Sequence, residues 1–360
     1  MRACVKLASR GEVPVSPVGI ADTTVTESSI GTHEKTHATN QATQRMGFFL
    51  VPHFSMMALS SATEPLRAAN RISGEPLYSW HLISVDGEAV SSSSGFALLP
   101  EFAITSSPAF SHLFVVASIG VTDYRNVQVF DFLRRYAATG LTLGGISLGT
   151  MILARAGLLE RRRCTIHWEA LRELADEFPS LDLSRDLYCI DGDRVTCGGG
   201  TAAIDMMLDL IARQHGQQLA AEVADQFLHT RIRTAQESQK MAIQWRYGLE
   251  DRRLVNAVTL MEQNIESPIP LKTIADLVGV SARQFERLWL KVFNVRPSQF
   301  YLELRLKAAQ KLLRESTYSL LDIAMHCGFA SPSHLGRCYK QMFDRTPGQE
   351  RAIRDSGKQP

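Results

Sequence analysis

The 360-residue sequence has no uninterrupted apolar run of about 18 residues, so it predicts no membrane-spanning helix. Its six cysteines are scattered, without a Cys-x-x-Cys pair or a Cys/His cluster of zinc-ligand spacing, so no metal site is predicted. A secretory apolar segment is missing from the N-terminus, which favours a cytoplasmic protein with reduced thiols. The 39 Lys and Arg nearly balance the 37 Asp and Glu, so the total charge indicates no strongly charged partner.

The composition, 45% apolar and 21% charged, is typical of a globular protein and excludes fibrous and largely disordered chains. The length exceeds that of one ordinary domain and predicts two or three. Residues 1–44 are rich in Ser, Thr, Ala and Val and lack a sustained apolar period. We expect them to form a disordered tail. The alternatives are a transit peptide, or a stretch upstream of a natural start at Met46.

Residues 45–230 show short apolar runs alternating with helix-like stretches. This alternation predicts a parallel sheet covered by helices on both faces, with ligands at the carboxyl ends of the strands. The predicted strands are residues 47–51, 81–85, 113–117, 141–146 and 187–190. The predicted helices are residues 58–71, 127–138, 148–159, 168–178 and 202–215.

Residues 231–250 are polar and predict a linker, after which residues 251–353 show only helical patterns, with a short tail at 354–360. The helical region repeats itself, because Ala275-x-x-x-Gly279 recurs 49 residues later as Ala324-x-x-x-Gly328. Each unit predicts a helix, a turn at glycine and a second helix, joined by a helix at 300–314. Three further pairs recur 50 residues apart: Arg287 and Arg337, Phe293 and Phe343, and Pro297 and Pro347.

The second helix of each unit is two-faced. The apolar faces are predicted to be core: Phe285, Leu288, Trp289, Val292 and Phe293, then Leu335, Cys338, Tyr339, Met342 and Phe343. The opposite faces carry side chains that bind phosphates and base edges in a major groove. The predicted DNA contacts are Arg283, Gln284, Arg287, Lys291, Ser333, His334, Arg337, Lys340 and Gln341.

The ends of these helices and the charge distribution agree with that interpretation. Ser281 with Gln284 predicts a capping box, and Ser331 followed by Pro332 predicts a second helix start. From Glu250 onward there are 17 Lys and Arg against 12 Asp and Glu, whereas residues 1–249 hold 22 against 25. A basic helical domain joined to a slightly acidic α/β domain is typical of a nucleic-acid-binding protein.

Residues 251–353 resemble an AraC-type DNA-binding domain, most specifically over 322–343 and the following Thr346-Pro347. The resemblance implies two helix-turn-helix units that bind successive major-groove faces of double-stranded promoter DNA. Two positions depart from the family pattern. Gly336 lies inside the second recognition helix, and Asp344 stands where the family usually has Gly.

In the first domain, Gly145-Ile-Ser147-Leu-Gly149 matches the nucleophile elbow Gly-x-Ser-x-Gly of hydrolases. A hydrolase would also need an acid and a histidine downstream, but no oxyanion motif of the His-Gly-Gly-Gly kind precedes the serine. The motif alone leaves catalysis open. The available partners are Asp191, Asp193, Asp205, His215 and His229.

Residues 47–215 resemble the ThiJ/PfpI branch of the class I glutamine amidotransferase-like fold, which is flavodoxin-like. The matches are the opening strand and helix at 47–70, the elbow, and Thr165-Ile-His-Trp-Glu169. Enzymes of this branch carry Cys at the elbow, Glu on the first helix and His after the elbow, which correspond to Ser147, Glu64 and His167. A serine in place of the thiolate implies a pocket without catalysis. Backbone N–H groups of Leu148 and near Ile119 and Gly120 are expected to hold a ligand carboxylate.

The combination of an α/β flavodoxin-like domain with an all-α domain of two helix-turn-helix motifs resembles the GlxA family of bacterial transcription regulators. The resemblance implies a cytoplasmic homodimeric regulator, an activator, that binds promoter DNA and RNA polymerase and uses no cofactor. It also implies a small nitrogen-containing effector such as arginine, glycine betaine or carnitine. The alternatives are a Ser147-dependent hydrolase or amidase with an accessory DNA-binding domain, and an architectural DNA-binding protein without a ligand.

Overall fold

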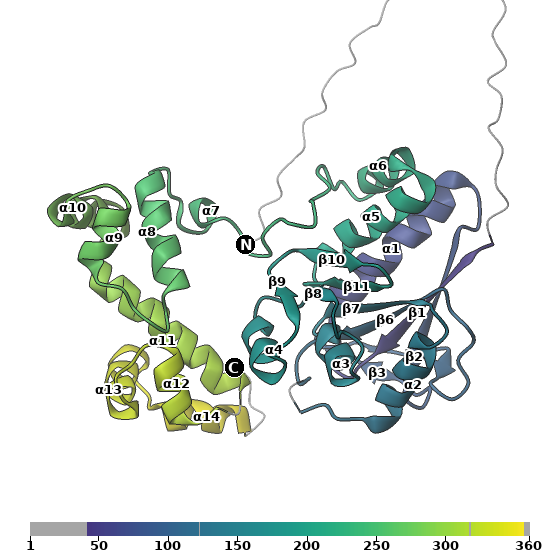
Figure 1. Ribbon diagram of the computed structural model, residues 1–360, viewed down its shortest axis with the longest axis horizontal. Helices are drawn as coiled ribbons and strands as arrows, with labels where there is room; N and C mark the ends of the chain where they lie inside the picture. The colour runs from purple at the N-terminus through teal and green to yellow at the C-terminus, as the bar shows by residue number, and fades with distance from the viewer. Residues whose placement is uncertain (1–41, 122, 317, 356–360) are drawn as a thin grey trace, which may run out of the picture. The chain divides into compact units, whose positions relative to one another are not determined.

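The computed structural model describes residues 42–355 except 122 and 317 (Figure 1). The predicted tails lie almost wholly outside the described residues, which leave out 1–41 and 356–360. Within the described ranges, none of the helices combines the length and hydropathy that a membrane span requires.

The first domain is built on a seven-stranded sheet with the strand order β10-β11-β7-β6-β1-β2-β5. Every neighbouring pair is parallel except β10 with β11, which confirms the predicted α/β class. The run at 187–190, expected in the parallel part, instead forms the antiparallel edge strand β10. The strands are β1 (Gln44–Leu50), β2 (Tyr78–Ser84), β5 (Phe102–Ala103), β6 (His112–Ala117), β7 (Thr142–Ser147), β10 (Tyr188–Asp191) and β11 (Arg194–Cys197). Two small sheets pair β3 (Val90–Ser91) with β4 (Ala97–Leu98), and β8 (Arg163–Thr165) with β9 (Asp182–Ser184).

Helices cover both faces of the sheet, as the apolar strands require (Figure 1). Successive residues of β1 supply opposite cores, with Phe48 in one cluster and Phe49 in the other. One face packs against α1 (Met56–Ser73), α5 (Ala202–His215) and α6 (Gln217–Gln226). The other face packs against α2 (Val127–Ala137), α3 (Gly149–Arg155) and α4 (Leu171–Glu177).

The second domain consists of helices, and two of its helix pairs form the predicted helix-turn-helix units. Each unit has its own core, around Trp289 in the first and Tyr339 in the second, two side chains 50 residues apart. The units are α9 (Leu271–Leu277) with α10 (Ala282–Phe293), and α12 (Leu320–His326) with α13 (Pro332–Phe343). The long helix α11 (Pro297–Glu315) joins them, flanked by α7 (Ile243–Tyr247), α8 (Arg252–Gln263) and α14 (Pro347–Asp355).

The turns and helix ends follow the chemistry of their residues. Gly279 and Gly328 have φ angles of 77° and 70°, the left-handed conformation that the repeated glycines predict. The capping box of Ser281 with Gln284 and the cap at Ser331 are both formed. Asp344 ends α13 in a left-handed conformation, as Asn294 ends α10, because short polar side chains tolerate this geometry.

One predicted core residue lies outside the core. The side chain of Val292 is 49% exposed, whereas Phe285 and Trp289 on the same helix are buried. The i, i+3, i+4, i+7 pattern places Val292 on the edge of the apolar face of α10, outside the cluster of buried residues that forms the core of this unit.

Gly336 gives a prediction about stability. A Cβ atom built on Gly336 meets nothing within 4 Å, so alanine fits inside α13 without displacing an atom. Gly336→Ala should stabilise the second helical unit by about 1 kcal/mol, the usual difference in helix propensity. Thermal unfolding of the full chain measures this effect. Gly328→Ala is the opposite control, since its φ is positive and its Cβ would lie 2.6 Å from the Ile265 carbonyl oxygen. A lower melting temperature for Gly336→Ala would contradict the prediction.

Candidate functional sites

The polar face of α10 carries the first group of predicted DNA contacts. Arg283, Gln284 and Arg287 are exposed and, with Ser281, line a hollow of about 310 Å³ at the start of the helix. The Gln284 side-chain oxygen accepts the backbone N–H of Ser281 at 3.0 Å, which leaves its amide NH₂ group facing outward for other partners. Lys291 is exposed further along the helix.

The polar face of α13 carries the second group. Ser333, Arg337, Lys340 and Gln341 are exposed, as the two-faced pattern predicts. His334 is half-buried, because its ring packs edge-on against Phe329 with the centroids 5.4 Å apart. His334 therefore also contributes to the packing of the turn.

The basic side chains on these two faces are electrostatically uncompensated. Other arginines of this domain pair with carboxylates: Arg253 lies 2.6 Å from Asp251, and Arg314 lies 2.6 Å from Glu350. A cation without a carboxylate partner offers its full charge to a phosphate. Across the part of the chain that the structure describes, no carboxylate lies within ion-pair distance of Arg283, Arg287, Lys291, Arg337 or Lys340.

In the first domain, Ser147 ends β7 in a sharp elbow. Its φ of 59° is left-handed, and its side chain is buried. The motif glycines are required by close packing, because a Cβ on Gly149 would lie 1.9 Å from the Val115 carbonyl oxygen, and one on Gly145 would lie 2.6 Å from the Thr150 nitrogen. The elbow geometry therefore persists with serine in it.

The carboxyl ends of β6 and β7 bring several predicted ligand residues to one edge of the sheet. Ala117 pairs with Ser147, so the exposed residues Ile119 and Gly120 leave β6 beside the elbow. The backbone N–H of His167 donates to the Ser147 carbonyl at 3.4 Å. Leu148 differs from the expectation, since its N–H already donates to the Ala117 carbonyl at 3.2 Å and would have to leave that bond to hold a ligand.

Glu64, on α1, is paired with a neighbour on its own helix. It occupies the third turn of α1, about 12 Å along the helix from Met56. Its carboxylate is half-exposed and accepts a hydrogen bond from Arg67 at 2.8 Å. Among the contacts of the described residues, none joins Glu64 to Ser147 or His167.

His167 shows no sign of activating Ser147. Its Nδ1 accepts the backbone N–H of Glu169 at 3.4 Å, and burial lowers the pKa of the imidazole. Within the described ranges, no hydrogen bond joins the Ser147 hydroxyl to a histidine or a carboxylate, the arrangement that an activated serine requires.

Comparison with known proteins agrees with this division of the chain. Residues 49–213 match the DJ-1/PfpI family, and residues 274–353 match a helix-turn-helix domain. The HTH-type transcriptional regulator CdhR of Pseudomonas aeruginosa is 42% identical over 86% of this chain and 92% of its own. The regulator GlxA of Rhizobium meliloti is 38% identical over 86% of this chain and 95% of its own. The chain belongs to the GlxA-like helix-turn-helix transcriptional regulators.

A solved structure is similar to about half of the chain. An AraC family transcriptional regulator from Pseudomonas putida is 29% identical to this regulator, with a TM-score of 0.48 over 51% of this chain and 99% of its own.

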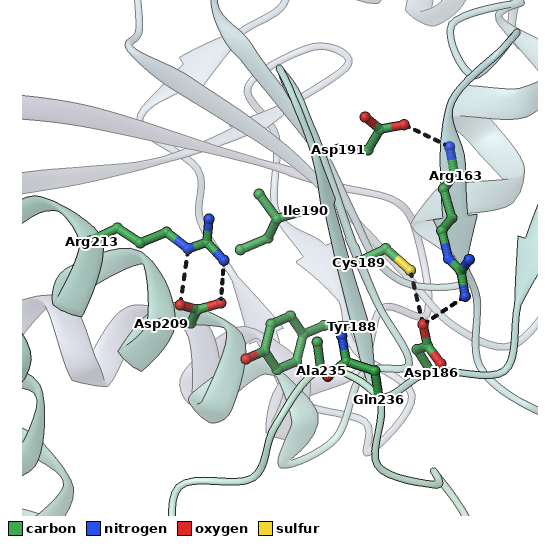
Figure 2. Close-up of a pocket in the computed structure, with 10 residues that line it drawn as sticks. All are labelled: Arg163, Asp186, Tyr188, Cys189, Ile190, Asp191, Asp209, Arg213, Ala235 and Gln236. Atoms are coloured by element: carbon green, nitrogen blue, oxygen red, sulfur yellow. Dashed lines mark hydrogen bonds and ion pairs between the residues drawn. The ribbon is translucent and has the colours of Figure 1, made fainter.

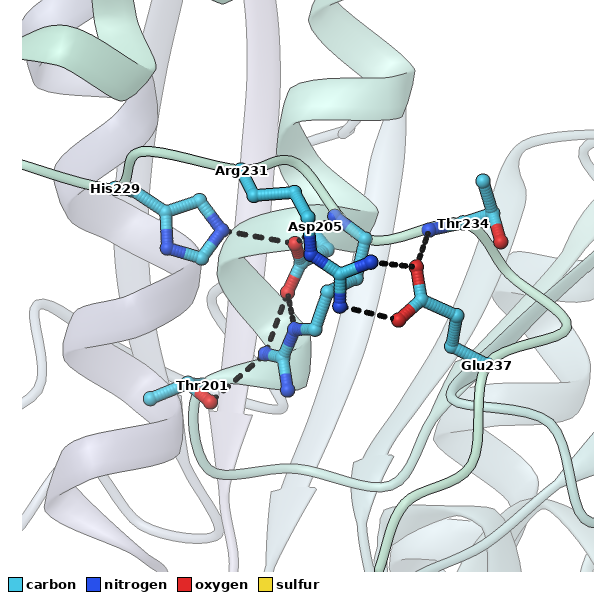
Figure 3. A network of polar contacts seen from close by, with 7 residues as sticks. Thr201, Asp205, His229, Arg231, Thr234 and Glu237 are labelled. Atoms are coloured by element: carbon cyan, nitrogen blue, oxygen red, sulfur yellow. Dashed lines mark hydrogen bonds and ion pairs between the residues drawn. The ribbon is translucent and has the colours of Figure 1, made fainter. Parts of the chain in front are cut away.

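The regulator contains a buried polar network that the sequence did not indicate (Figure 3). The carboxylate of Asp205, on α5, is fully buried and accepts hydrogen bonds from the Arg233 backbone N–H at 2.7 Å and from its guanidinium at 2.6 Å. His229 Nε2 lies 2.9 Å from the same carboxylate. Asp205 and His229 were both available to a hydrolase on sequence grounds, but the Asp205 carboxylate instead binds both His229 and Arg233.

Further backbone contacts change the interpretation of residues 231–250 as a simple linker. The backbone N–H of Leu187 donates to the Ala235 carbonyl at 2.8 Å, and Ser238 forms a β-bridge with Asp186. We call residues 229–240 the strap, because they run along the first domain before the chain enters the helical one. The first half of the predicted linker is thus part of the regulator's α/β domain.

A second hollow, of about 140 Å³, lies at the edge strand β10 (Figure 2). Its charged groups neutralise one another: Arg163 lies 3.2 Å from Asp186, and Arg213 lies 2.9 Å from Asp209. Burial raises the pKa of the Cys189 thiol beside them to about 11, so this cysteine is protonated near neutral pH. We assign no ligand to this hollow.

Proposed function

We propose that the regulator binds promoter DNA in a sequence-specific manner by placing α10 and α13 in successive major-groove faces. The observation that carries the proposal is the pair of exposed helix faces with uncompensated cations, one on each helix-turn-helix unit. Arginine and glutamine recognise base edges, and lysine binds phosphates. The proposed contacts are Arg283, Gln284, Arg287, Lys291, Ser333, His334, Arg337, Lys340 and Gln341.

We propose further that the first domain binds a small effector at the elbow edge of the sheet. Ser147, His167 and the loop at Ile119 and Gly120 come together there. We propose an effector with an amino or quaternary ammonium group and a carboxylate, such as arginine, glycine betaine or carnitine, whose carboxylate would be held by backbone N–H groups near Ile119 and Gly120. In this proposal the regulator is a cytoplasmic homodimeric activator that contacts RNA polymerase and needs no cofactor.

Binding of the full chain to DNA at graded salt concentrations tests the first proposal. We expect selection from fragments of the source genome to enrich a defined operator, whose affinity falls steeply between 50 and 200 mM salt because about six or more phosphates are neutralised. Equal affinity for operator and unrelated DNA would refute sequence-specific binding and favour the architectural alternative.

The second candidate function is a Ser147-dependent hydrolase or amidase, and the preserved elbow with its left-handed serine favours it. We infer that the domain is not catalytic, since Ser147 lacks the adjacent base that a serine nucleophile needs. The purified chain should therefore hydrolyse neither ester nor amide substrates. Turnover that Ser147→Ala abolishes, and that the matched Ser238→Ala preserves, would establish the hydrolase instead.

A further inference from the structure

The ring of Trp168 carries two cations. Trp168 lies between β8 and α4, and its residue surface is 39% exposed. The ammonium nitrogens of Lys240 and of Lys311, on α11, each lie 4.3 Å from the centroid of the ring, the geometry of a cation–π contact. The imidazole of His167 is beside the ring, with the two centroids 5.6 Å apart.

Gln239 ties the strap to the loop that carries Trp168. Its side-chain oxygen accepts the backbone N–H of Trp168 at 2.8 Å, and its amide nitrogen donates to the Ile166 carbonyl at 3.0 Å and the Asp186 carbonyl at 2.8 Å. Gly198 makes room for this amide, since a Cβ there would lie 2.5 Å from the Gln239 oxygen. Gln239 therefore fixes the strap to the Trp168 loop through several hydrogen bonds, in a space that Gly198 leaves open.

The Trp168 loop is also connected to the elbow. The backbone N–H of His167, the residue before Trp168, donates to the Ser147 carbonyl. On the other side of the elbow, Gly199 approaches Ser147 so closely that a Cβ would lie 2.4 Å from the serine Cβ. Two consecutive residues of the strap, Gln239 and Lys240, thus contact the loop next to the proposed effector site. The chain continues from them into α8, which starts at Arg252.

We propose that the ring of Trp168 binds the ammonium group of the effector, and that Lys240 and Lys311 are the internal cations that the effector displaces. The proposal rests on the proposed function, in which the effector lies at the elbow edge, and it specifies the ligand as a cation. A full positive charge over an indole face is attracted by the ring quadrupole, so the ligand competes with these two lysines for the ring. Displacement of Lys240 frees the end of the strap while Gln239 still holds the loop in place.

Calorimetric titration of the full-length chain tests the competition. The probes are glycine betaine, L-carnitine and L-arginine, with 3,3-dimethylbutanoate as the control, because it has the shape of glycine betaine but a neutral carbon in place of the nitrogen. We expect at least one cationic probe to bind, and the isostere that lacks the ammonium charge not to bind. Trp168→Ala should weaken the binding about tenfold or more. Lys240→Gln should tighten it, and Lys240→Gln combined with Lys311→Gln should tighten it further, because the competing cations are removed. The exposed Lys272→Gln is the matched control without effect.

Three results would overturn the proposal: Trp168→Ala binds the cationic probes as the parent chain does, the double variant Lys240→Gln with Lys311→Gln leaves their affinity unchanged, or none of the cations binds even to that double variant. Trp168→Phe keeps an aromatic face and should retain most of the affinity, which separates loss of the ring contact from misfolding. Operator binding, measured on the same samples, tests the proposed function separately. If the parent chain and Lys240→Gln with Lys311→Gln bind the operator but none of the cationic probes, this site is rejected and the DNA-binding proposal stays intact.

Discussion

Arg337→Ala should weaken operator binding by about 1–3 kcal/mol if Arg337 contacts a guanine edge. Arg287→Ala, 50 residues earlier in the repeat, should have an effect of similar size. Both guanidinium groups are exposed and lack a carboxylate partner among the described residues, so each has its charge and all its donors available to DNA. Fluorescence anisotropy with a labelled operator measures the loss.

The matched control for both variants is Arg253→Ala. Arg253 is also an exposed arginine of the helical domain, but it pairs with Asp251 at the start of α8. Its removal should change operator affinity little. If Arg337 contacts a phosphate instead, Arg337→Ala should weaken binding to all DNA sequences alike. It should also lower the slope of log affinity against log salt concentration by about one. Parent-like affinity in both Arg287→Ala and Arg337→Ala would remove these helices from the interface.

Arg233→Ala should destabilise the first domain by about 3–5 kcal/mol, because it leaves the fully buried carboxylate of Asp205 without its cation. Arg231→Ala is the control two residues away. Its side chain is 69% exposed and pairs with Glu237, so its loss should cost about 0–1 kcal/mol. Chemical denaturation of the full chain gives both free energies of unfolding.

A second variant keeps this prediction testable if Arg233→Ala fails to fold. Asp205→Asn removes the buried charge but keeps an oxygen that can accept the Arg233 backbone N–H. It should therefore fold and be less destabilised than Arg233→Ala. Equal stability of Arg233→Ala and Arg231→Ala would show that the strap is not anchored through Asp205.

The repeated helical units could be predicted from the sequence because their signals are local. The glycine at each turn, the serine caps and the i, i+3, i+4 apolar spacing each follow from a few adjacent residues, and the structure forms all of them. The strands β1, β6 and β7 were equally recognisable, because a strand buried on both faces is a short continuous apolar run.

What the sequence could not specify depends on contacts between distant segments. In the sequence, Gln239 is an ordinary polar residue of the predicted linker. Its side-chain hydrogen bonds to the Ile166 and Asp186 carbonyls join residues that are 73 and 53 positions apart in the chain. The strand β11, four residues long, carries too little apolar signal to distinguish from a loop. Glu64 matched a family position by its place on a helix. Its contact with Arg67, rather than with Ser147 or His167, could not be predicted from that place.

The central claim is that the two helix-turn-helix units bind DNA together, and footprinting of the selected operator by the full chain tests it most directly. We expect two protected major-groove segments about one helical turn, 10–10.5 base pairs, apart. Arg287→Ala should weaken protection of one segment and Arg337→Ala that of the other. A single protected segment that responds to only one of the two variants would contradict the claim.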